Sequence, residues 1–212
     1  MNEINLAITP KRFQAAHEAG HATIAKYFNF SMNHIVIKGK IELPSNISPH
    51  VSLKDPREAN TEFFAGGVAG VLFADFPDIS TEIFNEIKYS NKHFTWYTQG
   101  FDEDVQKFKA KMREINAEIH TDYREYTDGR VILSRDRTFV PNTFVDKIYD
   151  SYLLIRKEET AFNKFKNILI EHEFVGRNAA HSVCEGLEYN PVANERDLLA
   201  FSRIAKGEQF KF

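Results

Sequence analysis

Apolar residues recur at the spacing of an α-helix near the start of the chain. Four of them fall close to one helical face between residues 10 and 28: Phe13, Ala16, Ile24 and Phe28. Thr9 suits the cap of such a helix, and Pro10 suits its first position. Only Gly20 weakens the pattern, at a cost of about 1 kcal/mol relative to alanine, unless another element must approach closely there. We therefore expect a helix over residues 10–28.

The pattern then changes to the alternation of β-strands. Residues 34–38 alternate in this way and end at Gly39, and residues 50–53 suit a returning strand. A loop rich in proline, serine and asparagine separates them, from Pro44 to Pro49. These segments predict a small β-ribbon beside the first helix.

A second helix is predicted over residues 58–75. Asp55 suits its cap, Pro56 its first position, and Glu58 follows that cap by three residues. Residues 65–70 are alanine, glycine and valine, whose small side chains let a neighbouring helix approach closely. We expect this helix to pack on the first one in the core and to end at residues 76–80.

Three further segments have helical spacing. An amphipathic helix opens near residue 102 and runs to about residue 120, and a short one covers residues 195–205. The longest pattern covers residues 142–173 and is followed by Gly176, which suits the position after a helix end. Between residues 121 and 141 the spacing is lost around the turn signal Asp128-Gly129, which predicts a surface loop or a lid. The predicted fold class is mainly α, with a small sheet (α+β).

Composition narrows the classes of function. The chain has 212 residues, of which 42% are hydrophobic, enough for one domain with a sizeable core. A net charge of −3 argues against a nucleic-acid partner. The single cysteine, Cys184, excludes an internal disulfide and favours a reducing compartment, so we expect a cytoplasmic protein. The start of the chain lacks the pattern of a signal peptide, and the longest nearly apolar run, residues 63–76, is too short for a membrane span.

The first helix contains the pattern H-E-x-x-H, formed by His17, Glu18 and His21. On a helix the two histidines share one face, with Cβ atoms about 5–6 Å apart, so both imidazoles can reach one metal ion. Zn²⁺ suits two imidazoles and keeps a position for water, whose proton Glu18 lies close enough to accept. A third ligand must come from elsewhere. The acids at residues 102–104 suit the first turn of a helix, where they complement the helix dipole.

At residues 17–22, the sequence H-E-A-G-H-A resembles the signature of the peptidase M41 family, the zinc peptidase domain of FtsH-type AAA+ proteases. Residues 65–69 and 100–105 are similar to two further segments of that family. The second of these implies that Asp104 is the third zinc ligand, with Asp102, His93 and Glu62 as alternatives. The chain departs from the family pattern at three positions: Gly67 replaces a common arginine, Gly70 the expected glutamate, and Phe101 a small residue.

The resemblance implies a helical zinc-peptidase domain with a β-ribbon next to the H-E-x-x-H helix. We expect residues 1–212 to form one M41-like domain, with a zinc-binding core (1–120), the loop or lid (121–141) and a C-terminal helical part (142–212). The implied function is a zinc metalloendopeptidase that cuts peptides or flexible protein segments, with Glu18 as the general base on zinc-bound water. No G-x-x-x-x-G-K-[ST] loop occurs, so we expect cleavage without ATP.

Two alternatives remain for the function. One is a regulatory protease of the ImmA/IrrE kind, which also uses H-E-x-x-H. The other is a non-catalytic binding or assembly module that a metal stabilises, which the replacements at Gly67 and Gly70 keep open. The expected partner is a peptide or protein substrate, and the sequence leaves open a homo-oligomer or a separate partner protein. We interpret His172 and His181 as surface or helix-end histidines rather than ligands.

Overall fold

A computed structural model describes residues 10–38, 49–84, 102–115 and 142–205. The protein is mainly helical with a small antiparallel sheet, as predicted. The elements follow in the order α1 (Pro10–Tyr27), β1 (Met32–Val36), β2 (His50–Leu53), the 3-10 helix η1 (Pro56–Glu58), α2 (Thr61–Asp75), α5 (Asp102–Ile115), α7 (Asn142–Lys157), α8 (Glu159–His172), β3 (Phe174–Gly176), α9 (Arg177–Cys184) and α10 (Pro191–Ala205).

The centre of the fold is a close crossing of α1 and α2. A Cβ atom added to Gly20 would lie 2.9 Å from the Gly70 Cα atom and would also meet the backbone of Gly66. A Cβ atom on Gly70 would meet the Ala16 carbonyl oxygen and lie 2.7 Å from the Gly20 Cα atom. The two helices therefore touch backbone to backbone, which only glycine permits at these positions. This contact explains the otherwise costly Gly20 and the small residues of α2.

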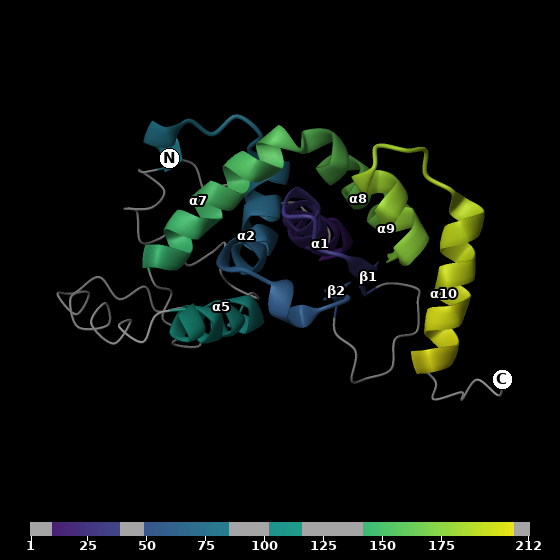
Figure 1. Cartoon of the computed structure of the whole chain (residues 1–212). Helices are drawn as coiled ribbons and strands as arrows, with labels where there is room; N and C mark the ends of the chain where they lie inside the picture. The colour runs from purple at the N-terminus through teal and green to yellow at the C-terminus, as the bar shows by residue number, and fades with distance from the viewer. Residues whose placement is uncertain (1–9, 39–48, 85–101, 116–141, 206–212) are drawn as a thin grey trace.

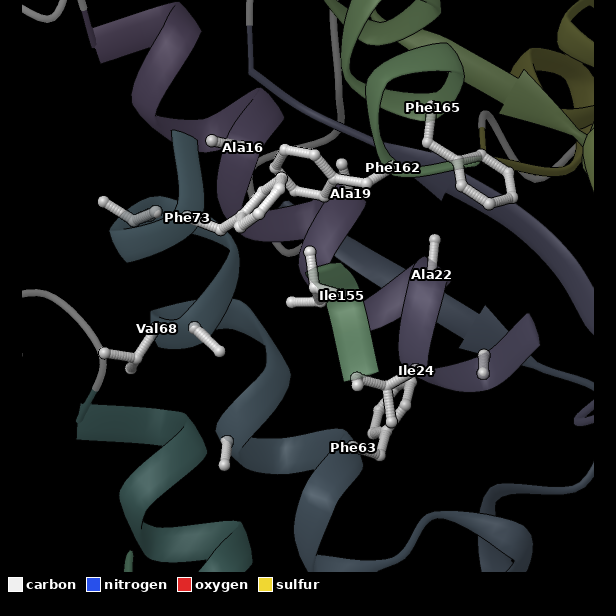
Figure 2. Packing of buried hydrophobic residues seen from close by; sticks show 14 of the residues in the cluster. Ala16, Ala19, Ala22, Ile24, Phe63, Val68, Phe73, Ile155, Phe162 and Phe165 are labelled. Atoms are coloured by element: carbon white, nitrogen blue, oxygen red, sulfur yellow. The ribbon is translucent and has the colours of Figure 1, made fainter. Parts of the chain in front are cut away.

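Helices α7 and α8 cover this pair of helices, and α5 lies on the other side of α2 (Figure 1). Phe73 of α2 meets two aromatic rings at T-shaped angles, with centroids 5.6 Å from Tyr152 and 5.3 Å from Phe162. Figure 2 shows Phe73 and Phe162 beside the small side chains of Ala16 and Ala19 on α1. Large rings thus fill the space that the alanines of α1 leave, as close packing requires.

The sheet has the strand order β2-β1-β3, and both pairings are antiparallel. Ile35 of β1 pairs with Val51 of β2 on one side and with Val175 of β3 on the other. The predicted two-stranded ribbon is therefore incomplete, because β3 comes from the far end of the chain. As a result β1 has both edges paired, whereas among the described residues β2 pairs with a strand on one edge only.

The start of α2 and the position of β1 differ from the prediction. Asp55 caps only η1, where its side chain accepts a hydrogen bond from the Arg57 backbone N–H, 3.0 Å away. The helix α2 begins after Asn60, whose side chain accepts from the Phe63 N–H at 2.8 Å. The first predicted strand also lies two residues earlier than expected, at Met32–Val36.

The long pattern at residues 142–173 is two helices, so the prediction of one was wrong. The chain turns at Glu158, whose N–H donates to the carbonyls of Leu154 and Ile155 and whose carboxylate accepts from Lys26 Nζ at 2.6 Å. The helix α8 ends at His172, and the left-handed residue that follows its end is Glu173, with a φ of 61°, rather than Gly176. Gly176 belongs to β3 and caps α9.

Several predictions lie outside the described residues: the loop from Pro44, the turn at Asp128-Gly129 and the lid at residues 121–141. No helix in the described ranges is long and apolar enough to cross a membrane.

Candidate metal centre

Two histidines of α1 form the first half of the candidate metal centre. His17 and His21 are one helical turn apart, and their rings lie at 84° with centroids 4.6 Å apart. Their Nε2 atoms face each other at 3.1 Å. The helix carries both rings to the same point, because residues i and i+4 share a face.

The second half comes from α5. Asp104 Oδ2 lies 3.1 Å from His17 Nε2 and 3.3 Å from His21 Nε2. The next turn of α5 carries Phe108, which is buried against Phe144 of α7 with ring centroids 4.8 Å apart. This apolar contact and the packing of α5 on α2 bring the first turn of α5 to the histidines. The three ligand atoms lie within 4.8 Å of one another.

The structure therefore brings Asp104 to the histidines, and not the other acid for which it shows a side chain. Glu62 accepts a hydrogen bond from Lys147 Nζ at 2.6 Å and another from the Thr61 hydroxyl at 2.9 Å. Of the remaining alternatives, Asp102 begins α5 but its side chain lies outside the described part of the chain, as does His93.

A backbone carbonyl sets the orientation of the second histidine. His21 Nδ1 donates to the Phe63 carbonyl oxygen, 2.6 Å away. In a neutral ring this leaves the lone pair on Nε2, the atom that faces His17 and Asp104. Histidines that bind metals usually have such an acceptor on the other nitrogen. Phe63 lies in the first turn of α2, so the helix crossing also positions this carbonyl.

Gly67 forms one wall of the centre. A Cβ atom at this position would touch the His17 ring and lie 2.6 Å from His21 Nε2. Any larger residue would push into the space between the two imidazoles. A glycine at position 67 therefore has a geometric reason. In the same way, Gly70 lies against the backbone of α1, where a glutamate does not fit.

Charge and burial act against each other in this cluster. Burial acts to lower the pKa of His21, but the Asp104 carboxylate overcomes it and raises the pKa to about 9. Burial acts to raise the pKa of Asp104, but His21 and His17 overcome it and hold the pKa well below its usual range. An anionic oxygen thus faces two basic nitrogens, which is the donor set of a divalent metal site.

Glu18 lies beside the cluster and is almost completely buried, with 3% of its surface exposed. Its Oε1 atom is 3.8 Å from His17 Nε2, and its Oε2 atom has no hydrogen-bond partner among the described residues. Burial raises the pKa of Glu18, and Asp104 acts in the same direction, although His17, His21 and His50 act to lower it. A buried carboxylate oxygen without a hydrogen-bond partner is costly, and such atoms are frequent at functional sites.

These residues fit a zinc ion. Two imidazole nitrogens and one carboxylate oxygen form a common catalytic donor set for Zn²⁺. The Asp104 Oδ2 atom is buried, and apart from its close approach to the two imidazoles it has no hydrogen-bond partner in the described part of the chain, as expected for an atom that binds a cation. Metal binding itself stays a prediction.

Three features of this centre were not found from the sequence. Gly67 was noted only as a departure from a family pattern, and the role of a glycine depends on what lies opposite it. The Phe63 carbonyl carries no sequence signal at all. The sequence predicts only a strand position for His50, yet this residue acts electrostatically on Glu18.

Comparisons with known proteins add no relative: the chain matches no protein-family model, and a search of curated proteins gave no match.

Proposed function

We propose that the protein is a zinc-dependent endopeptidase that cuts peptides or flexible protein segments without ATP. The observation that supports this most is the meeting of His17, His21 and Asp104 beside the buried Glu18, whose Oε2 atom has no partner among the described residues. The resemblance of residues 17–22 to the M41 signature agrees with this chemistry.

Each side chain has a distinct task in this proposal. His17, His21 and Asp104 hold the ion, which when bound polarises a peptide carbonyl and makes water more acidic. Glu18 accepts the proton of the attacking water and passes it to the departing amine nitrogen. Its burial favours this transfer, because bulk water competes little for the carboxylate.

Strand β2 is suited to hold the substrate backbone. It contacts α1 through β1 and directly, and its outer edge pairs with no strand in the described ranges. An extended peptide that adds to this edge gains backbone hydrogen bonds whatever its sequence. His50, the first residue of β2, acts electrostatically on Glu18, so this end of the strand lies toward the reacting groups. We also propose that the protein resides in the cytoplasm, a reducing compartment, because a single cysteine forms no internal disulfide.

The test combines metal analysis with a peptide-library digest of wild type and two variants. Wild type should retain about one zinc per chain and cleave peptides, and Glu18→Gln should keep the zinc and lose cleavage by at least about a hundredfold. Glu103→Gln is the matched control, because this glutamate on α5 is exposed and pairs with Lys107 at 2.7 Å on the surface. It should leave both properties unchanged.

Each other outcome has a definite meaning. Zinc retained with no cleavage by wild type would overturn the peptidase proposal and favour a metal-stabilised binding module. Cleavage restricted to a single folded protein would favour a regulatory protease of the ImmA/IrrE kind. Equal cleavage by wild type and Glu18→Gln would refute the assigned role of Glu18.

A further inference from the structure

A cavity of about 690 Å³ lies apart from the candidate metal centre, and none of its lining residues belongs to that centre. It is bounded by the end of α1, the start of β1, the length of α9 and one residue of α10, Asp197. Figure 1 shows these elements on the side of the molecule away from α5. Its volume falls in the range of sites for small ligands, about 300–1,000 Å³.

One part of the lining is apolar. Four residues contribute it: Phe30, Met32, Ala180 and Cys184. Burial raises the pKa of the Cys184 thiol to about 11, so this cysteine offers an apolar surface rather than a nucleophile. Phe30 also stacks on the exposed ring of Phe28, with centroids 5.7 Å apart. This part of the cavity suits an aliphatic or aromatic side chain.

Two of the charged groups in the lining already have partners. Lys26 Nζ donates to Glu158 Oε2 at 2.6 Å. Asp197 accepts from the Asn178 backbone N–H at 3.0 Å and from the Asn178 side-chain amide at 3.2 Å. These groups hold the walls of the cavity together.

Two charged groups remain, at opposite ends of α9. Arg177 is the first residue of this helix, and Glu185 follows its last. Neither forms an ion pair with any residue that the structure describes, and both are exposed. Eight residues at about 1.5 Å each place them about 12 Å apart along the axis. The dipole of α9 adds positive partial charge at the Arg177 end and negative partial charge at the Glu185 end, so it reinforces the side-chain charge at each end. Lys26 and His181 also line the cavity, so its surroundings are mixed rather than basic.

We propose that this cavity binds short peptides with free termini. An extended peptide of three or four residues spans about 10–14 Å, which matches the separation of the two charges. Its carboxylate pairs with Arg177, its ammonium group with Glu185, and a central apolar side chain lies on the Phe30 side. Peptides of this size are also what an endopeptidase releases, but the site depends only on the cavity and would serve a non-catalytic protein equally.

The experiment uses the tripeptide Ala-Leu-Ala, titrated by calorimetry into the full chain carrying Glu18→Gln, which prevents hydrolysis. Binding should weaken by about tenfold in Arg177→Gln and in Glu185→Gln, because each loses a charge-assisted contact. The matched controls are Arg196→Gln and Glu195→Gln on the exposed side of α10, which should leave binding unchanged. Circular dichroism verifies the fold of each variant.

Blocked peptides assign the two ends. The N-acetylated peptide should be insensitive to Glu185→Gln, and the C-terminal amide insensitive to Arg177→Gln. Ser31→Trp, at an exposed residue of the lining, should fill the cavity and abolish binding. Binding that survives Ser31→Trp, or equal binding of the doubly blocked peptide, would overturn the proposal. Binding lost only in Asp104→Asn would place the peptide at the metal centre and would also overturn it.

Discussion

The two halves of the candidate metal centre are built differently. His17 and His21 stand on a helix that touches α2 backbone to backbone, through three glycines. Asp104 stands on α5, which packs mainly against α2 and is held by side chains such as Phe108. The first half is rigid because the helices have no space to move closer and no side chains between them to rearrange.

One half of the centre therefore fixes the positions of two ligands, whereas the other half determines whether the third ligand reaches them. The α1–α2 crossing fixes two ligands, the Phe63 carbonyl and the Gly67 wall in one step. The docking of α5 adds one ligand and depends on a few apolar contacts. We therefore expect changes at the crossing to affect the whole fold, and changes on α5 to affect the metal centre with most of the fold retained.

The largest effect is expected for Gly20→Ala. The added Cβ atom would meet the backbone of Gly66 and Gly70, which cannot rotate away, so α1 and α2 must separate. We expect a loss of unfolding free energy of about 4 kcal/mol, at the upper end for one methyl group. Urea unfolding followed by circular dichroism measures it.

Gly67→Ala is the matched comparison, because it adds the same methyl group to the other helix of the α1–α2 crossing. Here the methyl group meets two imidazole rings instead of backbone. Zinc binding should be lost while the unfolding free energy changes by no more than about 1 kcal/mol. Normal zinc binding by Gly67→Ala would show that the rings do not approach as described.

Phe108→Ala tests the docking of α5. Removal of this buried ring should cost about 3 kcal/mol. Hydrogen exchange should accelerate in α5 and remain slow in α1 and α2. Equal acceleration in all three helices would contradict the separation of the two halves.

Asp104→Asn removes the charge that α5 contributes, with little change in volume. Zinc affinity should fall by about a hundredfold, or about 2.7 kcal/mol, in a competition with a chelator. Asp102→Asn should leave the affinity within a few-fold of wild type. The reverse result would assign the third ligand to Asp102.

The smallest effect is a pH dependence located in the sheet. His34 contacts Phe201 at a ring-centroid distance of 4.6 Å and His50 at an Nε2–Nε2 distance of 3.1 Å. Burial, and to a smaller extent His50, lowers the pKa of His34 to about 4. Between pH 6.5 and 4 the imidazole of His34 therefore binds a proton in the unfolded chain but not in the folded protein. The free energy of unfolding falls as the pH falls through this range.

His34→Gln should flatten this decline when urea unfolding is compared at pH 7.5 and pH 5. Because the sheet carries no metal ligand among the described residues, zinc affinity at pH 7.5 should be unchanged. An unaltered pH slope would show that another group causes the decline.

Local spacing in the sequence determined a large part of this fold. The ranges of α1 and β2, the packing of α2 on α1 and the placement of two histidines on one face all follow from the order of residues. The sequence predicts a helix start near residues 102–104, and only the resemblance singles out Asp104. The ranges of the elements and the shared face of the histidines depend on neighbours only a few positions away, which is why the sequence reveals them.

Only the tertiary structure decided where the chain turns and what surrounds the site. The break at Glu158 and the third strand at Phe174–Gly176 appear where Glu158 meets Lys26 and β3 meets β1. The wall at Gly67 likewise exists because α2 crosses α1 at that residue. Periodicity reports which side chains face an apolar neighbour, but a turn, a strand pairing or a glycine contact depends on a partner far away in the sequence. That partner is brought near only when the whole core packs.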